Sequence, residues 1–465
     1  MERKRRSTPL IIFPIIAVVI IAAVVILLPI NGKVSIGSES VNRNVQELTL
    51  SEGDYDTDAL IKALPQLKKL TKISFPETEL SAEELDRIRS AADGVEIDFT
   101  LDIGGKTYDQ TCTKLDLSEL DSEQLLQAAP KLALLPELSE IELMSSSGSS
   151  ALSIADVKQL TEKLPNVKVH YEFDLFGKHI STQDERVEYV DVKIGNEGVD
   201  EIREALSIMS GCSYLLLDTC GIDDEEMAAL RDEFPDKKIV WRIYLKSIFP
   251  EDHYDFLTDE QALRITYNLD DSNCHQLDYC TECVYLDIGH NESLTDISFV
   301  SHMPKLECII AGGSPISDLT PFKNCQNLTW MELGWCGLIT DISPLKDIPS
   351  LRYLNIGFTG VSDLSPLNDL HLERLTAMGT DIPKKASSAF EKDHPDCLCV
   401  FEGSQPYGYG WRYNDEGYTF FDYYVHMREV FHYDAQDYHG NTKTSEFCPI
   451  YLKDYEGYPW YEWQK

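Results

Sequence analysis

A repeated pattern in residues 283–381 constrains the fold of this chain more than any other feature. Five segments there read apolar-x-x-apolar-x-apolar, and their starts are 23, 22, 23 and 21 residues apart. A second motif, for example Ile339-Thr-Asp-Ile-Ser-Pro-Leu345, follows each of the first four segments. Two motifs that share one period predict a solenoid, in which each repeat adds one strand and stacks on its neighbour. The five segments begin at Cys283, Leu306, Leu328, Leu351 and Leu372.

These segments resemble leucine-rich repeats, in the short variety of the internalin-type surface proteins. The resemblance implies an α/β fold: a right-handed leucine-rich-repeat solenoid with parallel strands on its concave side. It also implies display at a surface and recognition of another macromolecule, without indicating which one. The chain differs from the internalins in its N-terminal segment and in having no Leu-Pro-x-Thr-Gly sorting motif near its end.

The N-terminal segment predicts a membrane anchor. Residues 10–30 are apolar, interrupted only by Pro14 and Pro29, and four basic residues precede them. At about 1.5 Å per residue, this stretch reaches about 30 Å as a helix, enough to cross a bilayer core. The basic flank places residues 1–9 in the cytoplasm and the bulk of the chain outside the cell membrane. A cleaved signal peptide is the alternative, but no Ala-x-Ala site follows, so we expect an uncleaved single-pass signal anchor.

Between the anchor and the short repeats lie a stalk and a longer repeat. Residues 31–46 are polar and rich in serine and glycine, which predicts a stalk. In residues 47–250, alternating strand patterns begin at Val95, Val167 and Ile239, 72 residues apart. Each unit of about 72 residues reads strand–helix–strand–helix–strand. We expect these divergent units to continue the solenoid, because stacking would cover strand faces that one unit leaves open. Three separate small α/β domains are the alternative.

The remaining segments flank the short repeats. Residues 251–282 predict a connector that contains a strand near 262–268, and residues 283–396 form the leucine-rich repeats. Residues 397–465 break the period and hold 12 of the 23 tyrosines. Solenoids need an atypical end that covers the last repeat, so this aromatic-rich segment predicts a C-terminal cap.

The repeat register predicts a ligand-binding strip. Apolar positions of a strand point to the core, so the third, fifth and eighth positions of each repeat point outward from the concave face. Exposed aromatic rings are costly in water, and they dominate binding hot spots. We therefore expect a protein, peptide or glycan ligand here; the alternative is that the rings pack on each other or beneath the C-terminal segment. The strip comprises Tyr285, Asp287, His290, Trp330, Glu332, Trp335, Tyr353, Asn355, Phe358 and Arg374.

Charge and composition narrow the partners further. The formal net charge is −38, and an acidic surface repels nucleic acid and anionic lipid. We therefore expect no nucleic-acid partner, and we expect the chain to contact the membrane only through the predicted N-terminal helix. The pair Cys280 and Cys283, with Cys274 and His275 nearby, has zinc spacing but no second matching pair. Cys283 also occupies a core position of the repeat. We therefore expect no metal and no cofactor.

No nucleophile elbow, phosphate loop or metalloprotease helix is present, so we do not expect an enzyme. Three alternatives remain. The first is an envelope hydrolase that uses His432 and Asp434 of the C-terminal segment. The second is a wall-glycan-binding protein that uses the aromatic residues of the same segment. The third is a passive structural spacer.

Overall fold

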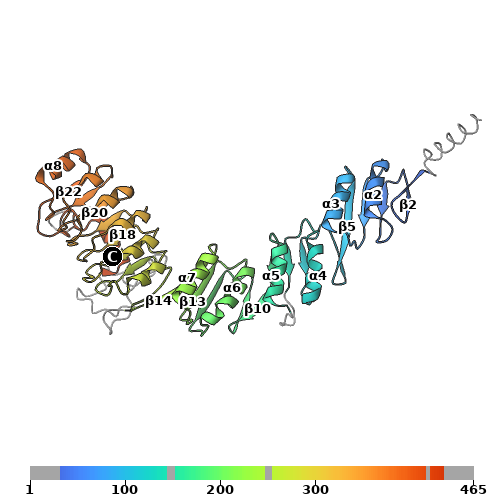
Figure 1. Cartoon of the computed structure of the whole chain (residues 1–465), viewed down its shortest axis with the longest axis horizontal. Helices are drawn as coiled ribbons and strands as arrows, with labels where there is room; N and C mark the ends of the chain where they lie inside the picture. Colours follow the sequence, from blue (N-terminus) through green and yellow to red (C-terminus); the bar gives the residue numbers. More distant parts are fainter. Residues whose placement is uncertain (1–31, 144–151, 247–253, 415–418, 434–465) are drawn as a thin grey trace, which may run out of the picture. The chain divides into compact units, whose positions relative to one another are not determined.

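The computed structural model describes residues 32–143, 152–246, 254–414 and 419–433 (Figure 1). The predicted cytoplasmic tail at 1–9 and the predicted anchor at 10–30 lie outside these residues. Within the described ranges, no helix combines the length and the apolarity needed to cross a membrane. The chain divides into two compact parts, one made of residues up to Glu185 with Asp200–Cys212, the other of Arg186–Val199 with the residues from Ser213 onward.

The predicted stalk is folded for part of its length. Strands β1 (Lys33–Ser35) and β2 (Ser40–Asn42) form an antiparallel hairpin. Val34 and Ile36, two residues apart and therefore on one face, are both buried. Residues 33–42 of the predicted stalk therefore form a hairpin with a small apolar face.

Each of the 72-residue units has the predicted order of strand, helix, strand, helix and strand. Helix starts are fixed by local capping: the Ser81 hydroxyl accepts a hydrogen bond from the Glu84 backbone amide at 3.3 Å, and the Glu84 carboxylate accepts one from the Ser81 backbone amide at 3.0 Å. The first unit contains β3 (Glu47–Thr49), α2 (Thr57–Ala63), η2 (Leu64–Gln66), β4 (Lys72–Phe75), α3 (Ala82–Ala91), β5 (Glu96–Ile103) and β6 (Lys106–Asp109). The second contains β7 (Lys114–Asp116), α4 (Ser122–Leu132), β8 (Glu140–Glu142), α5 (Ile154–Lys163), β9 (Lys168–His170), β10 (Glu172–Leu175) and β11 (Lys178–Ser181). The third contains β12 (Arg186–Val190), η3 (Asn196–Gly198), α6 (Val199–Ile208), β13 (Tyr214–Asp218), α7 (Asp224–Glu233), β14 (Lys238–Leu245) and β15 (Tyr254–Leu257).

The strand ladder does not run continuously through these units. Their sheets have the separate orders β3-β4-β5-β6, β7-β8-β9, β10-β11 and β12-β13-β14-β15. In the first and last of these sheets, the last strand returns antiparallel along the edge of its neighbour, β6 on β5 and β15 on β14. An edge that is already paired cannot accept a parallel strand from the next unit. The described strands from β3 to β15 therefore form four separate sheets and not one continuous ladder.

The short repeats form one parallel sheet of seven strands (Figure 1). Its strands pair in the predicted register, so that Tyr285, Cys308, Trp330, Tyr353 and Arg374 are successive partners. The array gains one strand from the predicted connector and one from the predicted cap. The strands are β16 (Ala262–Arg264), β17 (Tyr285–Asp287), β18 (Cys308–Ile310), β19 (Trp330–Glu332), β20 (Tyr353–Asn355), β21 (Arg374–Thr376) and β22 (Leu398–Val400). The register and spacing confirm the parallel leucine-rich-repeat solenoid that the sequence predicts for this part of the chain.

The second motif forms the turn of helix on the side opposite the sheet. Asp318, Asp341 and Asp363 each accept a hydrogen bond at 2.8 Å from the backbone amide two residues later. This bond opens a short 3-10 helix, and a proline in its first turn fixes the backbone. The connecting helices are η4 (Cys274–Tyr279), η5 (Ser298–His302), η6 (Thr320–Asn324), η7 (Ser343–Asp347), η8 (Ser365–Leu367) and α8 (Lys384–Asp393).

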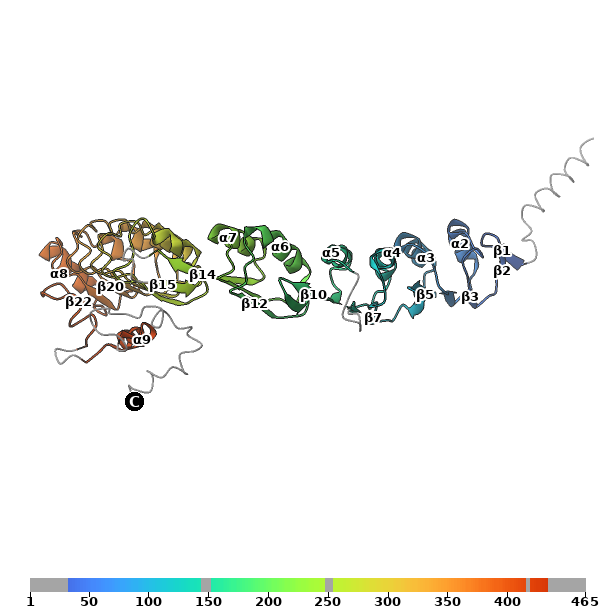
Figure 2. The same ribbon diagram turned by 90° about the horizontal axis from the view of Figure 1, so that it is seen from below.

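The C-terminal segment, defined here as residues 405–414 and 419–433, leaves the repeat pattern after β22. It includes helix α9 (Asp422–Val430), and Figure 2 shows α9 on the strand side of the seven-stranded array. The segment thus meets the face on which the sequence places the binding strip.

Candidate functional site

The strip of outward-facing residues is covered by the C-terminal segment over most of its length. Trp330 has an exposed fraction of 0% and Glu332 of 1%, and Tyr285, Asp287 and Asn355 are also buried. The expectation that these five side chains face solvent is wrong. Tyr353 and Arg374 are partly buried. The alternative weighed from the sequence, packing beneath the C-terminal segment, describes this part of the strip.

Trp330 is the centre of the covered surface. Its ring lies 4.1 Å from the ring of Trp411, measured between centroids, and is stacked on Tyr423 at 5.2 Å with an interplanar angle of 3°. Phe421 and Tyr353 complete the group at 6.2 and 5.5 Å. Aromatic pairs contribute about 0.5–1.5 kcal/mol each beyond the area they bury, so this contact holds the C-terminal segment strongly.

Glu332 provides a buried negative charge beside this aromatic group. Its carboxylate accepts hydrogen bonds from the indole nitrogen of Trp411 and from the guanidinium of Arg412, whose Nη2 is 2.5 Å away. The Arg412 guanidinium also lies over the ring of Tyr407 at 4.5 Å. Burial lowers the pKa of Arg412, and the carboxylate of Glu332 more than offsets that effect, so the net pKa is raised. A carboxylate this buried needs such a partner, because desolvation of an unpaired charge is costly.

Further hydrogen bonds join the C-terminal segment to strands on either side of Glu332. The Tyr433 hydroxyl donates to Asp287 at 2.7 Å, and the Asn355 amide donates to the carbonyl of Pro406 at 2.9 Å. Arg374 lies 3.6 Å from the ring of Phe421 and donates to Asn414 at 2.5 Å. The segment therefore crosses the sheet from β21 to β17, with a polar contact at several strands.

Glycines at the seventh repeat position make room for this path. A Cβ atom on Gly312 would lie 2.2 Å from the hydroxyl of Tyr407, and one on Gly334 would lie 2.9 Å from the same ring. On Gly357 it would lie 2.7 Å from Pro406. The sequence carries these glycines at one position of successive repeats. This recurrence indicates that another segment packs closely against the repeat backbone, and it was not used in predicting the strip.

The eighth repeat position remains exposed or partly exposed and forms a second surface, here called the eighth-position row. Every member has a left-handed backbone, with φ between 59° and 79°. A non-glycine residue pays about 1–2 kcal/mol for this conformation, so bulky rings there are strained. The row consists of Tyr267, His290, Gly313, Trp335, Phe358 and Gly379.

The rings of the row are stacked in pairs. Tyr267 and His290 are 5.3 Å apart with an interplanar angle of 8°, and Trp335 and Phe358 are 4.1 Å apart at 7°. A Cβ on Gly379 would lie 2.6 Å from the Phe358 ring, so the glycine leaves space for a ring from the preceding repeat. Trp335 is 48% exposed and Tyr267 51%. Three of the predicted strip residues, His290, Trp335 and Phe358, therefore belong to an accessible surface.

Tyr267 was missed because it lies in the predicted connector. Aligning Leu263 and Ile265 with the fourth and sixth repeat positions places Tyr267 at the eighth position. The strand pairing of β16 with β17 supports this alignment. That spacing was the available signal.

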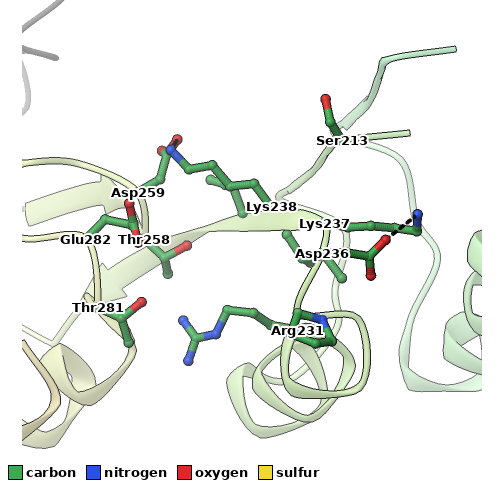
Figure 3. Close-up of a pocket in the computed structure, with 12 residues that line it drawn as sticks. Ser213, Arg231, Asp236, Lys237, Lys238, Thr258, Asp259, Thr281 and Glu282 are labelled. Carbon is green, nitrogen blue, oxygen red and sulfur yellow. Dashed lines mark hydrogen bonds and ion pairs between the residues drawn. The ribbon is translucent and has the colours of Figure 1, made fainter. Parts of the chain in front are cut away.

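A pocket of about 360 Å³ lies outside the short-repeat face, and Figure 3 shows its charged lining. Lys238 pairs with Asp259 at 2.7 Å, and Lys237 pairs with Asp236 at 3.2 Å. Arg231 donates to the carbonyl of Tyr279 at 2.9 Å. Because its cations have partners in the fold, the pocket does not form an anion site.

The weak metal and catalytic patterns gain no support. Within the described ranges, no group of three or more His, Cys, Asp or Glu residues has a metal-binding arrangement. Cys280 and Cys283 are fully buried, and burial raises the pKa of both thiols. His432 is buried, burial lowers its pKa to about 4, and Asp434 lies outside the described residues.

Comparisons with known proteins add the following. No family model and no curated protein matches the chain. An internalin from Listeria monocytogenes aligns with a TM-score of 0.28 at 18% identity, over 75% of this chain and 87% of that one. A leucine-rich-repeat protein from Leptospira interrogans aligns with a TM-score of 0.30 at 17% identity, over 72% of this chain and 91% of that one. The functional domain of another Listeria monocytogenes internalin, which includes a cysteine ladder, aligns with a TM-score of 0.26 at 13% identity, over 78% of this chain and 70% of that one. Scores of this size carry no argument about function.

Proposed function

We propose that this chain is a membrane-anchored, extracytoplasmic leucine-rich-repeat protein that binds a protein ligand through the eighth-position row. The anchor is the apolar stretch at 10–30, with residues 1–9 in the cytoplasm. The net charge of −38 fits recognition of another protein better than of nucleic acid or anionic lipid.

The stacked pair of exposed Trp335 and half-buried Phe358 is the observation that carries the proposal. Two bulky rings occupy left-handed backbone positions and are stacked in advance. Strain of this kind persists only where the surrounding fold over-determines it, and it concentrates at ligand sites. A pre-stacked ring also loses little side-chain freedom when it binds, which favours affinity.

The chemistry beside the pair favours a protein over a glycan. Leu338, three residues after Trp335, is 58% exposed. Apolar side chains next to an exposed tryptophan form the kind of contact that anchors protein interfaces. A sugar also stacks on rings, but it needs polar groups around the ring for its hydroxyls.

The test uses the full chain in its native membrane. A photo-crosslinking amino acid at position 335 is expected to trap a defined protein, and the same amino acid at position 244 is the control. Tyr244 is comparably exposed, at 54%, and lies outside the row on β14. The trapped protein is then purified, and its Kd is measured for the wild type, for Trp335→Ala and for Tyr244→Ala.

We expect Trp335→Ala to weaken binding at least tenfold, or about 1.4 kcal/mol, and Tyr244→Ala to leave it unchanged. An equal Kd for all three chains would contradict the row as the site. Trapping at neither position would favour the passive spacer. Binding to a glycan array that depends on Trp335 would replace the protein ligand by a glycan.

A further inference from the structure

The covered part of the concave face has the features of an occupied recognition site. The contacts of the C-terminal segment fall on outward-facing positions, while the repeats bury their own fourth positions, such as Leu286, Ile309 and Leu354, in a separate core. The covering contact is therefore an addition to a solenoid that already has its own interior. It includes a charge pair, several side-chain hydrogen bonds and a cluster of rings, as protein interfaces do.

The occupant defines what this site accepts. Pro406 and Tyr407 lie against Gly357, Gly334 and Gly312, where larger side chains would collide. Trp411 fills the position next to Trp330 and donates to Glu332. Arg412 then supplies the positive charge that the buried carboxylate requires.

We infer that the Glu332 site is a recognition site for a peptide segment that presents a tryptophan followed by an arginine, and that the C-terminal segment is its resident occupant. This inference rests on the proposed function only in that the partner is a protein. A partner with such a segment binds by displacing residues 405–414 from Glu332. The buried carboxylate selects against segments without the cation, because it would be left unpaired.

Tethering keeps the resident segment in place. A segment attached to the same chain competes at an effective concentration on the order of millimolar. A free peptide with similar contacts therefore binds measurably only when the resident contacts are weakened. The probe for this competition is the decapeptide with the sequence of residues 405–414.

The experiment measures binding of the labelled decapeptide to the full chain and to its Trp411→Ala/Arg412→Ala variant. The variant leaves the contacts of α9, such as the 2.9 Å bond between Tyr423 and Thr329, in place. We expect the variant to bind the peptide at least tenfold more tightly than the wild type. Peptide is also expected to raise the Tm of the variant and not that of the wild type.

The control changes only the probe. A decapeptide with Arg412→Ala is expected to bind the variant chain at least tenfold more weakly than the unchanged decapeptide, and adding Glu332→Gln to the chain should abolish this difference. Equal binding of the two peptides, or no peptide binding by a variant whose circular dichroism and cooperative unfolding match a folded chain, would overturn the inference.

Two further arms separate the sources of failure. Trp335→Ala added to the variant should leave peptide binding unchanged, so loss of the eighth-position row and loss of the Glu332 site give different results. Sedimentation of the wild type should show no concentration-dependent dimer. If the wild type forms a dimer that Arg412→Ala abolishes, the occupant is a second copy of this chain. That result would overturn the inference that a different protein binds the Glu332 site.

Discussion

The indole nitrogen of Trp411 donates a hydrogen bond to the carboxylate of Glu332, although 79 residues separate them along the chain. Arg412 pairs with the same carboxylate from the next position. This contact converts an outward-facing acid of the repeat into a buried one.

Removing the charge of Glu332 should destabilise the contact. Glu332→Gln keeps an acceptor for Trp411 but leaves Arg412 without its counter-charge. Breaking one partner of a buried pair costs about 2–5 kcal/mol, so urea unfolding should show a loss in that range. Glu292→Gln, at an exposed glutamate of the same array, is the matched control. A loss no larger than that of the control would show that Arg412 finds another partner.

A methyl group on a glycine at the seventh repeat position should dislodge the C-terminal segment. Gly312→Ala places a Cβ 2.2 Å from the Tyr407 hydroxyl, whereas Gly337→Ala meets no atom within 4 Å. Overpacking of this kind costs about 1–3 kcal/mol. We expect faster proteolysis within residues 405–414 and a red-shifted tryptophan emission for Gly312→Ala only. Identical digestion of the two variants would mean that Tyr407 moves without releasing the segment.

Acid should weaken the fold through the buried histidine of the C-terminal segment. Burial, assisted by nearby Arg264, lowers the pKa of His432 from 6.5 to about 4. The folded state therefore binds fewer protons than the unfolded state between these values. The stability that neutral His432 provides is complete above about pH 6.5 and is lost as the pH falls towards 4, with a slope of at most about 1.4 kcal/mol per pH unit.

Urea unfolding at pH values from 4.5 to 7.5 measures this slope. His432→Phe should flatten it, and substitution of exposed His371 by glutamine should not. His426, whose pKa burial also lowers, hydrogen-bonds Tyr285 at 3.1 Å and adds to the same dependence. Parallel slopes for the wild type and His432→Phe would assign the acid sensitivity to other groups.

The cysteines should differ sharply in reactivity. Burial raises the pKa of Cys274 to about 12, whereas a hydrogen bond from Cys397 lowers the pKa of partly exposed Cys399. Thiolates are the reactive form, so we expect maleimide to modify Cys399 first in the native chain. Mass spectrometry of timed digests checks the order, with urea-unfolded chain as the control. Early modification of any buried site would indicate local opening. The buried sites are Cys212, Cys220, Cys274, Cys280, Cys283, Cys308, Cys325 and Cys336.

The register of the short repeats was predictable because it is local. Leu354 and its equivalents recur at one spacing, and each aspartate of the second motif caps a helix two residues away. The pairing of Trp330 with Tyr353 follows from that periodicity alone. The same reasoning found His290, Trp335 and Phe358, which remain accessible or partly accessible in the structure.

The burial of Trp330 was not predictable from the repeats. It depends on Trp411 and Tyr423, which belong to a segment without period, and aperiodic sequence gives no register for docking. The separate sheets of the 72-residue units have a comparable cause. These sheets end where β6 and β15 pair antiparallel with the edge strands β5 and β14. Whether such a hairpin forms depends on a few turn residues, which the repeat period does not reveal.

The diagonal path of the C-terminal segment has an evolutionary consequence. Repeat proteins commonly gain and lose whole repeats, because each repeat contacts only its neighbours. Here one segment spans from Arg374 on β21 to Asp287 on β17. Deleting a single repeat within that span would shift the remaining strands by about 4.8 Å relative to the segment and would bring Arg412 opposite an uncharged residue. The C-terminal segment therefore fixes the number of repeats, and related chains should vary in length outside this span.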